Sequence, residues 1–474
     1  MDSNNFYTCL KTSFPFTPTI KQNIGLQKLS NFIFSTLTND IFVLKGYAGT
    51  GKTTIISVLV KNLWHAQKTA VLLAPTGRAA KVISNYSKSE AFTIHKKIYV
   101  PRAEKNGKIS FVLAPNKHKK TLFIVDEASM ISDISNQAKL FGSGSLLDDL
   151  IQFVYSGSQC KLLLIGDTAQ LPPVKLDLSP ALNESNLELN YNKEVIRLEL
   201  DEVVRQGEDS GILFNATHLR EAVSNSYFDS FHFNLNGFKD IVRLNDGYEI
   251  LDAINDAYST LGSEDTALIV RSNKRANLYN EQIRSRILFN ENELTAGDFL
   301  MIVKNNYFWL KPTSEAGFIA NGDIIEVLEI FSIKELYEFR FAEVKIRMVD
   351  YPKMRPFETV LMLDTIKLET PSLPYEESNK LYQEILKDFE DESSSYKKFL
   401  GVKKSKYLNS LQVKFSYAIT CHKSQGGQWD TVFVEQPYLP NGIDRDYLRW
   451  LYTAITRAKE KLYLIGFKDD FFED

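Results

Sequence analysis

Residues 41–54 read IFVLKGYAGTGKTT, an apolar run followed at once by a glycine-rich loop. The loop, Gly46-Tyr47-Ala48-Gly49-Thr50-Gly51-Lys52-Thr53, matches the pattern G-x-x-x-x-G-K-[ST]. An expected strand, Ile41–Lys45, precedes it, and an expected helix, Thr53–His65, follows it. Glycines here let backbone N–H groups curl around phosphates, and the start of the helix adds a favourable dipole. The sequence therefore predicts a site for a nucleoside triphosphate.

Within this loop, the pattern assigns separate tasks to two side chains. Lys52 is expected to reach the β- and γ-phosphates, and the Thr53 hydroxyl is expected to hold Mg²⁺. The residues of the loop that we expect to bind the nucleotide are Gly46, Gly49, Thr50, Gly51, Lys52, Thr53 and Thr54.

A second apolar run, Leu122–Val125, ends in two carboxylates. Asp126 is placed to bind Mg²⁺ through water, and Glu127 can orient and deprotonate an attacking water. A carboxylate base beside the metal favours hydrolysis over transfer to a bulky acceptor. We therefore predict a nucleotide hydrolase.

The rest of the chain continues the alternation of strands and helices, which predicts an α/β fold with parallel sheets. The further strands expected in the first half are Ala70–Ala74, Thr121–Val125 and Lys161–Ile165. A second set of strands is expected at Thr266–Val270, Val413–Ile419, Thr431–Val434 and Lys461–Ile465, with helices at Asn273–Ile287 and Asp446–Lys459.

Two insertions interrupt this pattern. Ile98–Arg102 and Lys108–Leu113 flank Asn106-Gly107, a strong hairpin signal. Later strands with intervening turn residues predict a small β insert at Asp298–Lys304, Asp323–Ile330, Phe339–Val349 and Thr359–Leu363. The charged segment Tyr375–Tyr407, with a helix at Glu376–Phe389, is interpreted as a solvated helical arm.

Composition restricts the classes of function. The chain has 474 residues, enough for two to four domains, and a net charge of −3, so any surface that binds nucleic acid must be local. The three cysteines, Cys9, Cys160 and Cys421, are widely spaced and form neither a disulfide framework nor a metal cluster. Neither a secretory signal nor an apolar run long enough to span a membrane is present, so we expect a cytoplasmic protein.

Short motifs occur in a fixed order along the chain. They are Thr19–Gln22, Ala74–Ala80, Thr93–Lys96, Asp126–Met130, Gly166–Val174, Val204–Gln206, Ser272–Asn277, Thr420–Gly426 and Tyr452–Lys459. In this order they resemble the motifs of superfamily 1B DNA helicases of the RecD and phage Dda type. The resemblance covers nearly the whole chain.

The resemblance implies a fold and a role for each motif. It implies two RecA-like P-loop domains, with a β-hairpin (pin) insert in the first and an SH3-like β insert plus helical arm in the second. The corresponding domain limits are 1–92 and 121–215, with the pin at 93–120, then 216–297 and 411–474, with the SH3-like insert at 298–410 and its arm at 375–407. The implied catalytic residues are Lys52, Glu127, Gln170, Arg205 and Arg457, with Gln22 reading the adenine of ATP. The implied DNA contacts are Pro75, Thr76, Arg78, His95, Asn273, His422, Lys423 and Ser424.

Arg457 explains why two domains are needed. A guanidinium from a second domain stabilises the charge on the γ-phosphoryl oxygens only when the cleft between the domains is closed. Hydrolysis then depends on domain position, as a motor requires.

The expected activity is an ATP- and Mg²⁺-dependent helicase that moves 5′→3′ on single-stranded DNA and opens forked duplex DNA, working as a monomer. RNA is left open as the track, because a grip on the backbone need not reject a 2′-hydroxyl. Two other functions stay possible on the sequence alone. One is a translocase that displaces proteins with little unwinding. The other is a nucleotide-dependent DNA-binding subunit of a larger complex.

Overall fold

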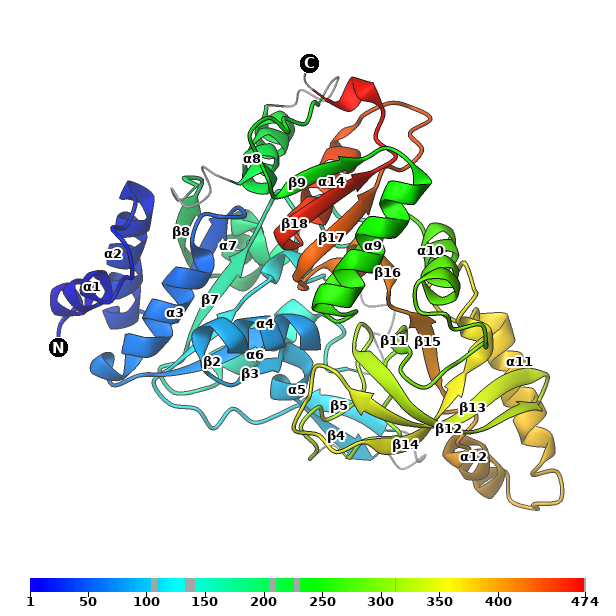
Figure 1. The fold of residues 1–474 in the computed structure, drawn as a ribbon. Coiled ribbons are helices and arrows are strands. Elements are labelled where there is room, and N and C mark those ends of the chain that lie inside the picture. Colours follow the sequence, from blue (N-terminus) through cyan, green and yellow to red (C-terminus); the bar gives the residue numbers. More distant parts are fainter. Residues whose placement is uncertain (104–108, 133–140, 204–209, 226–230, 312, 473–474) are drawn as a thin grey trace.

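The computed structural model describes residues 1–103, 109–132, 141–203, 210–225, 231–311 and 313–472. Two parallel sheets, a closed barrel and a hairpin make up its β structure, and helices cover both sheets (Figure 1). This is the predicted α/β class with two RecA-like domains and two inserts. Among the described residues, none of the helices is both long and apolar enough to cross a membrane.

The first domain is built on a six-stranded parallel sheet in the order β3-β2-β6-β7-β1-β8. Its strands are β1 Asp40–Gly46, β2 Thr69–Ala74, β3 Ala91–Thr93, β6 Thr121–Val125, β7 Lys161–Gly166 and β8 Glu194–Leu200. Its helices are α1 Ser3–Thr12, α2 Ile20–Phe34, α3 Lys52–Asn62, α4 Gly77–Ser87, α5 Ile94–Ile98, α6 Leu146–Tyr155 and α7 Glu184–Tyr191. Because the strands run parallel, β1, β2, β6 and β7 all end at one edge of the sheet, where the predicted motifs follow them.

The second domain has a five-stranded parallel sheet in the order β16-β10-β17-β18-β9. Its strands are β9 Ile241–Leu244, β10 Thr266–Val270, β16 Ala418–Thr420, β17 Trp429–Glu435 and β18 Ala458–Ile465. Its helices are α8 Gly211–Ser224, α9 Gly247–Leu261, α10 Asn273–Arg286, α13 Cys421–Ser424 and α14 Arg445–Ile455. Ile212 and Leu219 of α8 pack into the core of this domain, so the predicted domain limit at 215/216 falls inside a helix of the second domain.

Two predicted elements of the second half are wrong. The expected strand Val413–Ile419 is two strands, of which β15 Leu411–Phe415 belongs to the barrel and β16 belongs to the second sheet. The chain changes sheet at Tyr417, whose hydroxyl is bound to Asp298 Oδ1 at 3.0 Å. The expected helix Asp446–Lys459 ends at Ile455, because Ala458 already begins β18. At the first break, apolar residues alternate through Val413–Ile419 without interruption, so the pattern does not reveal the change of sheet.

The β insert is a closed barrel of β11 Phe299–Ile302, β12 Ile324–Leu336, β13 Phe339–Met348, β14 Phe357–Met362 and β15. Helices α11 Tyr375–Lys387 and α12 Ser395–Lys404 form the charged arm. The arm is not a freely solvated element, because Leu381, Ile385 and Val402 are buried with barrel residues such as Phe341.

The predicted hairpin consists of β4 Tyr99–Ala103 and β5 Ile109–Leu113. Its tip, 104–108, lies outside the described residues. The root of the hairpin reaches the barrel, since the Phe111 ring lies 4.8 Å from the Tyr307 ring and 4.7 Å from the Phe141 ring. The two inserts are therefore joined by aromatic packing.

Candidate nucleotide and nucleic-acid sites

The glycine-rich loop has the backbone that its sequence predicts. Gly49 and Gly51 have φ angles of 74° and 87°, in the left-handed region that favours glycine. Gly51 is the N-cap of α3, so the loop leads straight into a helix N-terminus. The Lys52 ammonium turns back over the loop and donates to the carbonyl oxygens of Gly46 at 2.6 Å and Tyr47 at 2.8 Å. Lys52 is thus held at the centre of the phosphate cradle.

The Gln22 side chain is hydrogen-bonded to the phosphate loop. Its amide Nε2 donates to the Thr50 carbonyl at 2.9 Å, and its Oε1 accepts from the Thr19 N–H at 3.0 Å in a capping box that starts α2. Both the nitrogen and the oxygen of the Gln22 amide are therefore hydrogen-bonded within the protein. The contact of Gln22 with adenine stays a prediction. Phe14 and Phe16 line the same cleft beside Gln22. The sequence analysis did not identify them, although an aromatic pair so close to the Thr19–Gln22 motif was a usable signal.

The acidic pair lies across the cleft from the loop. Asp126 Oδ1 accepts from the Glu127 N–H at 2.9 Å, and Oδ2 accepts from the Tyr86 hydroxyl at 2.6 Å. Glu127 has a φ of 54°, a left-handed conformation that is costly for a residue with a side chain and is typical of functional sites. Tyr86, from the last turn of α4, was missed by the sequence analysis.

The oxygen donors present suit Mg²⁺ bound through a nucleotide. The Thr53 side chain is exposed and the Asp126 carboxylate is partly exposed, and both line the cleft. Mg²⁺ at phosphates usually takes only one or two protein oxygens and keeps several waters. Thr53 and Asp126 therefore fit this mode of binding.

Burial and neighbouring charges both shift the pKa of the Glu127 carboxyl. Burial raises the pKa of its carboxyl above the ordinary value, and neighbouring Asp126 raises it further, while Arg457 and Lys52 lower it. A carboxylate with a raised pKa is a stronger base, and the two cations help to keep it ionised. Glu127 therefore has the environment of a general base.

The second domain contributes Arg457 to the cleft. The Arg457 side chain is buried at the end of α14, and its Nε donates to the Thr453 carbonyl at 2.9 Å. Its charge reaches across the domain boundary to Glu127. The cleft, with a volume of about 510 Å³, is lined by Lys52, Glu127 and Arg457 together, so both domains build one site.

The loop after β7 is bound directly by the second domain. The Tyr452 hydroxyl donates to Asp167 Oδ2 at 2.7 Å and accepts from the Ala48 N–H at 2.9 Å. The Thr453 hydroxyl accepts from the Leu171 N–H at 2.8 Å. One helix of the second domain thus contacts both the phosphate loop and Asp167. The sequence analysis had not given Tyr452 a role.

Gln170 lies in the same loop and also lines the cleft. It is 6% exposed, and its Oε1 has no hydrogen-bond partner among the described residues. A buried acceptor without a partner marks a place for a bound donor. Arg205, the remaining predicted catalytic residue, lies outside the described residues.

The predicted DNA contacts fall into two groups. The first surrounds the start of α4, where Pro75 follows β2 and the Thr76 hydroxyl caps the helix by accepting from the Ala79 N–H at 3.2 Å. A Cβ added to Gly426 would lie 3.2 Å from the Thr76 hydroxyl oxygen, so the motif of the second domain packs directly against this turn. In the same motif of the second domain, His422 is exposed and Lys423 is partly buried. Burial and nearby Lys414 lower the Lys423 pKa to about 8.

The other predicted contacts are engaged elsewhere. Ser424 is fully buried, and its hydroxyl donates to the Cys421 carbonyl at 2.8 Å. The Asn273 amide donates to the Glu369 carbonyl at 3.1 Å. The His95 ring lies 5.1 Å from the Phe141 ring, and burial lowers its pKa to about 4. These three side chains hold protein parts together in this conformation.

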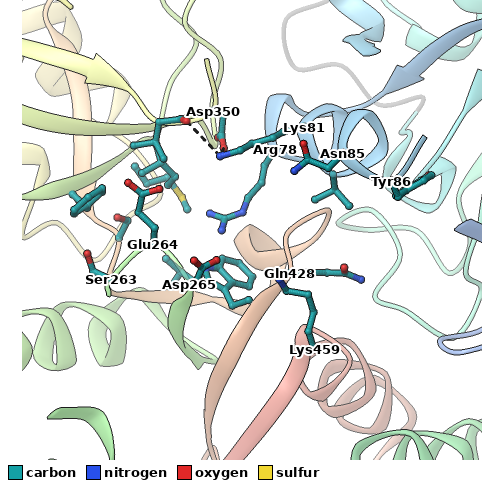
Figure 2. A pocket seen from close by; sticks show the side chains of 18 residues that line it. Arg78, Lys81, Asn85, Tyr86, Ser263, Glu264, Asp265, Asp350, Gln428 and Lys459 are labelled. Carbon is teal, nitrogen blue, oxygen red and sulfur yellow. Dashed lines mark hydrogen bonds and ion pairs between the residues drawn. The ribbon is translucent and has the colours of Figure 1, made fainter. Parts of the chain in front are cut away.

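Arg78 points into a second pocket between the domains (Figure 2). Its guanidinium lies 4.0 Å from the centre of the Trp429 ring. Burial lowers the Arg78 pKa, and the surrounding carboxylates of Asp350, Asp265 and Glu264 raise it. Arg78 therefore contacts the second domain instead of an open surface.

Comparison with known proteins gives two family matches. Residues 32–231 match the family described as an AAA domain, and residues 415–465 match the UvrD-like helicase C-terminal domain. The ATP-dependent DNA helicase dda of Enterobacteria phage T4 is 25% identical over 454 residues, covering 89% of this chain and 93% of that protein. The RecBCD enzyme subunit RecD of Buchnera aphidicola is 24% identical over 516 residues, covering 96% of this chain and 74% of that subunit. A crystal structure of the Pif1 helicase from Bacteroides, in complex with ADP-AlF3 and single-stranded DNA, aligns with 94% of this chain at 15% identity and a TM-score of 0.44.

These sequence matches cover both halves of the nucleotide cleft and most of the chain. They confirm the predicted resemblance to superfamily 1B helicases of the RecD and Dda type.

Proposed function

We propose that this chain, a relative of the RecD and Dda helicases, moves 5′→3′ along single-stranded DNA and separates the strands of forked duplex DNA. That it is an ATP-hydrolysing DNA helicase follows from its homology to these proteins. The observation that supports a motor is the composite cleft, in which Lys52 and Glu127 of the first domain face Arg457 of the second. The proposed direction rests on the resemblance to the RecD and Dda helicases.

The first domain supports binding of the nucleotide and activation of water. Lys52 exchanges its two loop carbonyls for phosphate oxygens, and Thr53 and Asp126 would hold Mg²⁺. When bound, Mg²⁺ neutralises charge on the phosphates. Glu127 accepts a proton from the attacking water, which its raised pKa favours. The unpaired Gln170 oxygen is available to orient that water.

The second domain makes this chemistry depend on domain position. Arg457 stabilises charge on the γ-phosphoryl oxygens only while the cleft is closed. Tyr452 and Thr453 bind the phosphate loop and the loop after β7 from the same helix. Opening the cleft removes Arg457 and breaks these bonds together, so the nucleotide state and domain position change as a unit.

The track is proposed to cross the edge where α4 meets the Thr420–Gly426 motif. There the turn at Gly426 of the second domain packs against Thr76 and Ala79 of the first. His422 and Lys423 precede this turn in the sequence, and His422 is exposed. A strand bound by both domains is moved when the domains separate and approach. Contacts of this kind with phosphates are tolerant of sequence and weaken as salt rises.

Unwinding of tailed duplexes tests the proposal. With ATP and Mg²⁺, a duplex with a 5′ single-stranded tail is expected to be separated, and one with a 3′ tail is not. Preference for the 3′ tail would contradict the direction. ATP-driven displacement of streptavidin from the 3′ end of a single strand, without unwinding of either duplex, would favour the translocase. The Lys52→Ala variant controls for contaminating activity in each assay.

A further inference from the structure

Helix α4 separates two pockets between the domains. Val82 and Tyr86 of this helix, with Gln428 and Lys459 of the second domain, line both the nucleotide cleft and the pocket that contains Arg78. Figure 2 shows Arg78, Lys81, Asn85 and Tyr86 on this helix, with Lys81 at Asp350, Arg78 near the pocket carboxylates and Tyr86 farther from them. The helix has 11 residues, a length of roughly 16 Å. A displacement of one end is therefore transmitted to the other.

The first turn of α4 is held by two other parts of the molecule. A Cβ added to Gly426 would lie 2.9 Å from Ala79 Cβ, so the motif of the second domain touches this turn. A Cβ added to Gly77 would lie 2.7 Å from Asp323 Oδ1 of the barrel. The Arg78 stack on Trp429 adds a third contact at 4.0 Å. A strand bound at Thr76 therefore acts on a turn that already senses the second domain and the barrel.

The last turn of α4 is hydrogen-bonded to the nucleotide machinery through Tyr86. The Tyr86 hydroxyl donates to Asp126 Oδ2 at 2.6 Å. Among the described residues, this is the one hydrogen bond that joins Asp126 to another side chain, since the Glu127 N–H is a backbone donor. The Tyr86 carbonyl also accepts from the Ser57 hydroxyl of α3 at 3.2 Å. Tyr86 thus joins α4 both to the acidic pair and to the helix that follows the phosphate loop.

We propose that Tyr86 is a positioning residue that transmits occupancy of the nucleic-acid site at the start of α4 to the Asp126 carboxylate. The inference rests on the proposed function, because it needs a strand at Thr76 and a nucleotide in the cleft. Tyr86 itself touches no reacting atom. Its hydroxyl fixes the orientation of the Asp126 carboxylate towards the cleft, because Oδ2 accepts from Tyr86 while Oδ1 accepts from the Glu127 N–H.

The Tyr86→Phe variant removes the hydroxyl and keeps the ring. The Tyr155→Phe variant is the matched control, because the Tyr155 hydroxyl donates to the Asp40 carbonyl at 2.6 Å at the opposite edge of the same sheet. Ser57→Ala is a second, milder variant that loosens the same residue. Circular dichroism and thermal melting establish that each variant is folded.

The decisive readout is coupling between two ligands. Fluorescence anisotropy gives the affinity for single-stranded DNA with and without Mg²⁺ and a non-hydrolysable ATP analogue. By linkage, the ratio of the two affinities measures how strongly the sites communicate, and about tenfold is a typical value. We expect a ratio of about ten in the wild type and in Tyr155→Phe. In Tyr86→Phe the two affinities are expected to agree within about twofold, and Ser57→Ala is expected to lie between these values. In Tyr86→Phe we also expect a higher Mg²⁺ concentration for half-maximal hydrolysis and a smaller stimulation by DNA.

The outcomes separate this inference from the proposed function. Coupling in the wild type that persists unchanged in Tyr86→Phe would overturn the role of Tyr86 and leave the motor intact. A wild type that neither binds DNA nor changes its DNA affinity with nucleotide would overturn the proposed function itself. Equal losses in Tyr86→Phe and Tyr155→Phe would show a general structural effect and would also overturn the inference.

Discussion

The two pockets on either side of α4 differ in how they are built. The nucleotide cleft is built largely on loops that follow strands, and two of these loops, Gly46–Thr53 and Asp126-Glu127, carry short patterns that can be read in the sequence. The pocket that contains Arg78 draws single residues from distant segments, among them Glu264, Asp350 and Trp429. Chemistry with a nucleotide needs fixed spacing, whereas communication between domains needs only contact in space. The residues for nucleotide chemistry can therefore be recognised in a sequence, whereas the contacts between domains cannot.

Arg457 is the residue on which hydrolysis in the nucleotide cleft is expected to depend most. We expect Arg457→Ala to lower kcat for ATP by about 10³-fold with little change in nucleotide affinity, because the guanidinium acts on charge that develops during hydrolysis. Steady-state hydrolysis and binding of a fluorescent ATP analogue measure the two quantities. Arg445→Ala, at an exposed position of α14, the helix that precedes Arg457, is the control and is expected to behave as wild type. Equal activity of the two variants would remove Arg457 from the mechanism.

Tyr452 tests whether the contact between α14 and the phosphate loop is functional. Its hydroxyl bridges the Ala48 N–H and Asp167. We expect Tyr452→Phe to reduce DNA-stimulated hydrolysis by about tenfold, since removing one partner leaves the buried Asp167 oxygen without a hydrogen bond. Hydrolysis rates with and without single-stranded DNA measure this. A variant that is stimulated as strongly as the wild type would show that the bridge only packs the domains.

Lys423 predicts how pH acts on the nucleic-acid site. Its pKa is lowered to about 8 by burial and by Lys414. Below that pH the ammonium is charged and attracts phosphate, and above it the charge is lost. We therefore expect affinity for single-stranded DNA to fall several-fold from pH 7 to pH 9. Anisotropy titrations across this range measure the effect. In Lys423→Arg, which stays charged throughout, the affinity is expected to change much less. An identical pH profile in both proteins would exclude Lys423 as the titrating contact.

Substitution of Arg78 is expected to have the smallest effect on DNA binding. It distinguishes most clearly between the two pockets. A side chain that contacts a phosphate contributes about one unit to the slope of log affinity against log salt. Because Arg78 stacks on Trp429, we expect Arg78→Ala to leave this slope unchanged, whereas Lys423→Ala lowers it by about one. Titrations at several salt concentrations measure both slopes. A reduced slope for Arg78→Ala would show that Arg78 leaves Trp429 to bind DNA.

Much of the fold was predictable because parallel strands buried on both faces are short apolar runs. Thr121–Val125 and Thr266–Val270 were predicted with the limits that the structure has. The strand break at Tyr417 was not predictable, because it depends on a hydrogen bond to Asp298, which is far away in the sequence. The arm was misread for a similar reason. Its charges are visible in the sequence, but the barrel surface that buries Leu381 and Ile385 is not.

The candidate site shows the same division. Lys52, Glu127 and Arg457 lie in recognisable motifs, and the structure brings them to one cleft. Tyr86 and Tyr452 carry hydrogen bonds between elements that meet only in the folded chain. His95 and Ser424 lie in motifs that the resemblance assigns to DNA, yet their side chains are used for packing and for a local hydrogen bond. The roles of these two residues towards DNA therefore stay predictions.

The central claim is that the nucleotide cleft drives movement on a DNA strand. It is tested most directly by the rate of ATP hydrolysis without nucleic acid, with single-stranded DNA and with single-stranded RNA, in the wild type and in Lys52→Ala. The account predicts strong stimulation by DNA, and a fall of roughly a hundredfold or more in Lys52→Ala, which loses the ammonium that stabilises the phosphates. Stimulation by single-stranded RNA but not by DNA would show that the track is RNA, and the assignment as a motor would stand. Hydrolysis that depends on Lys52 but is indifferent to every strand would contradict the account.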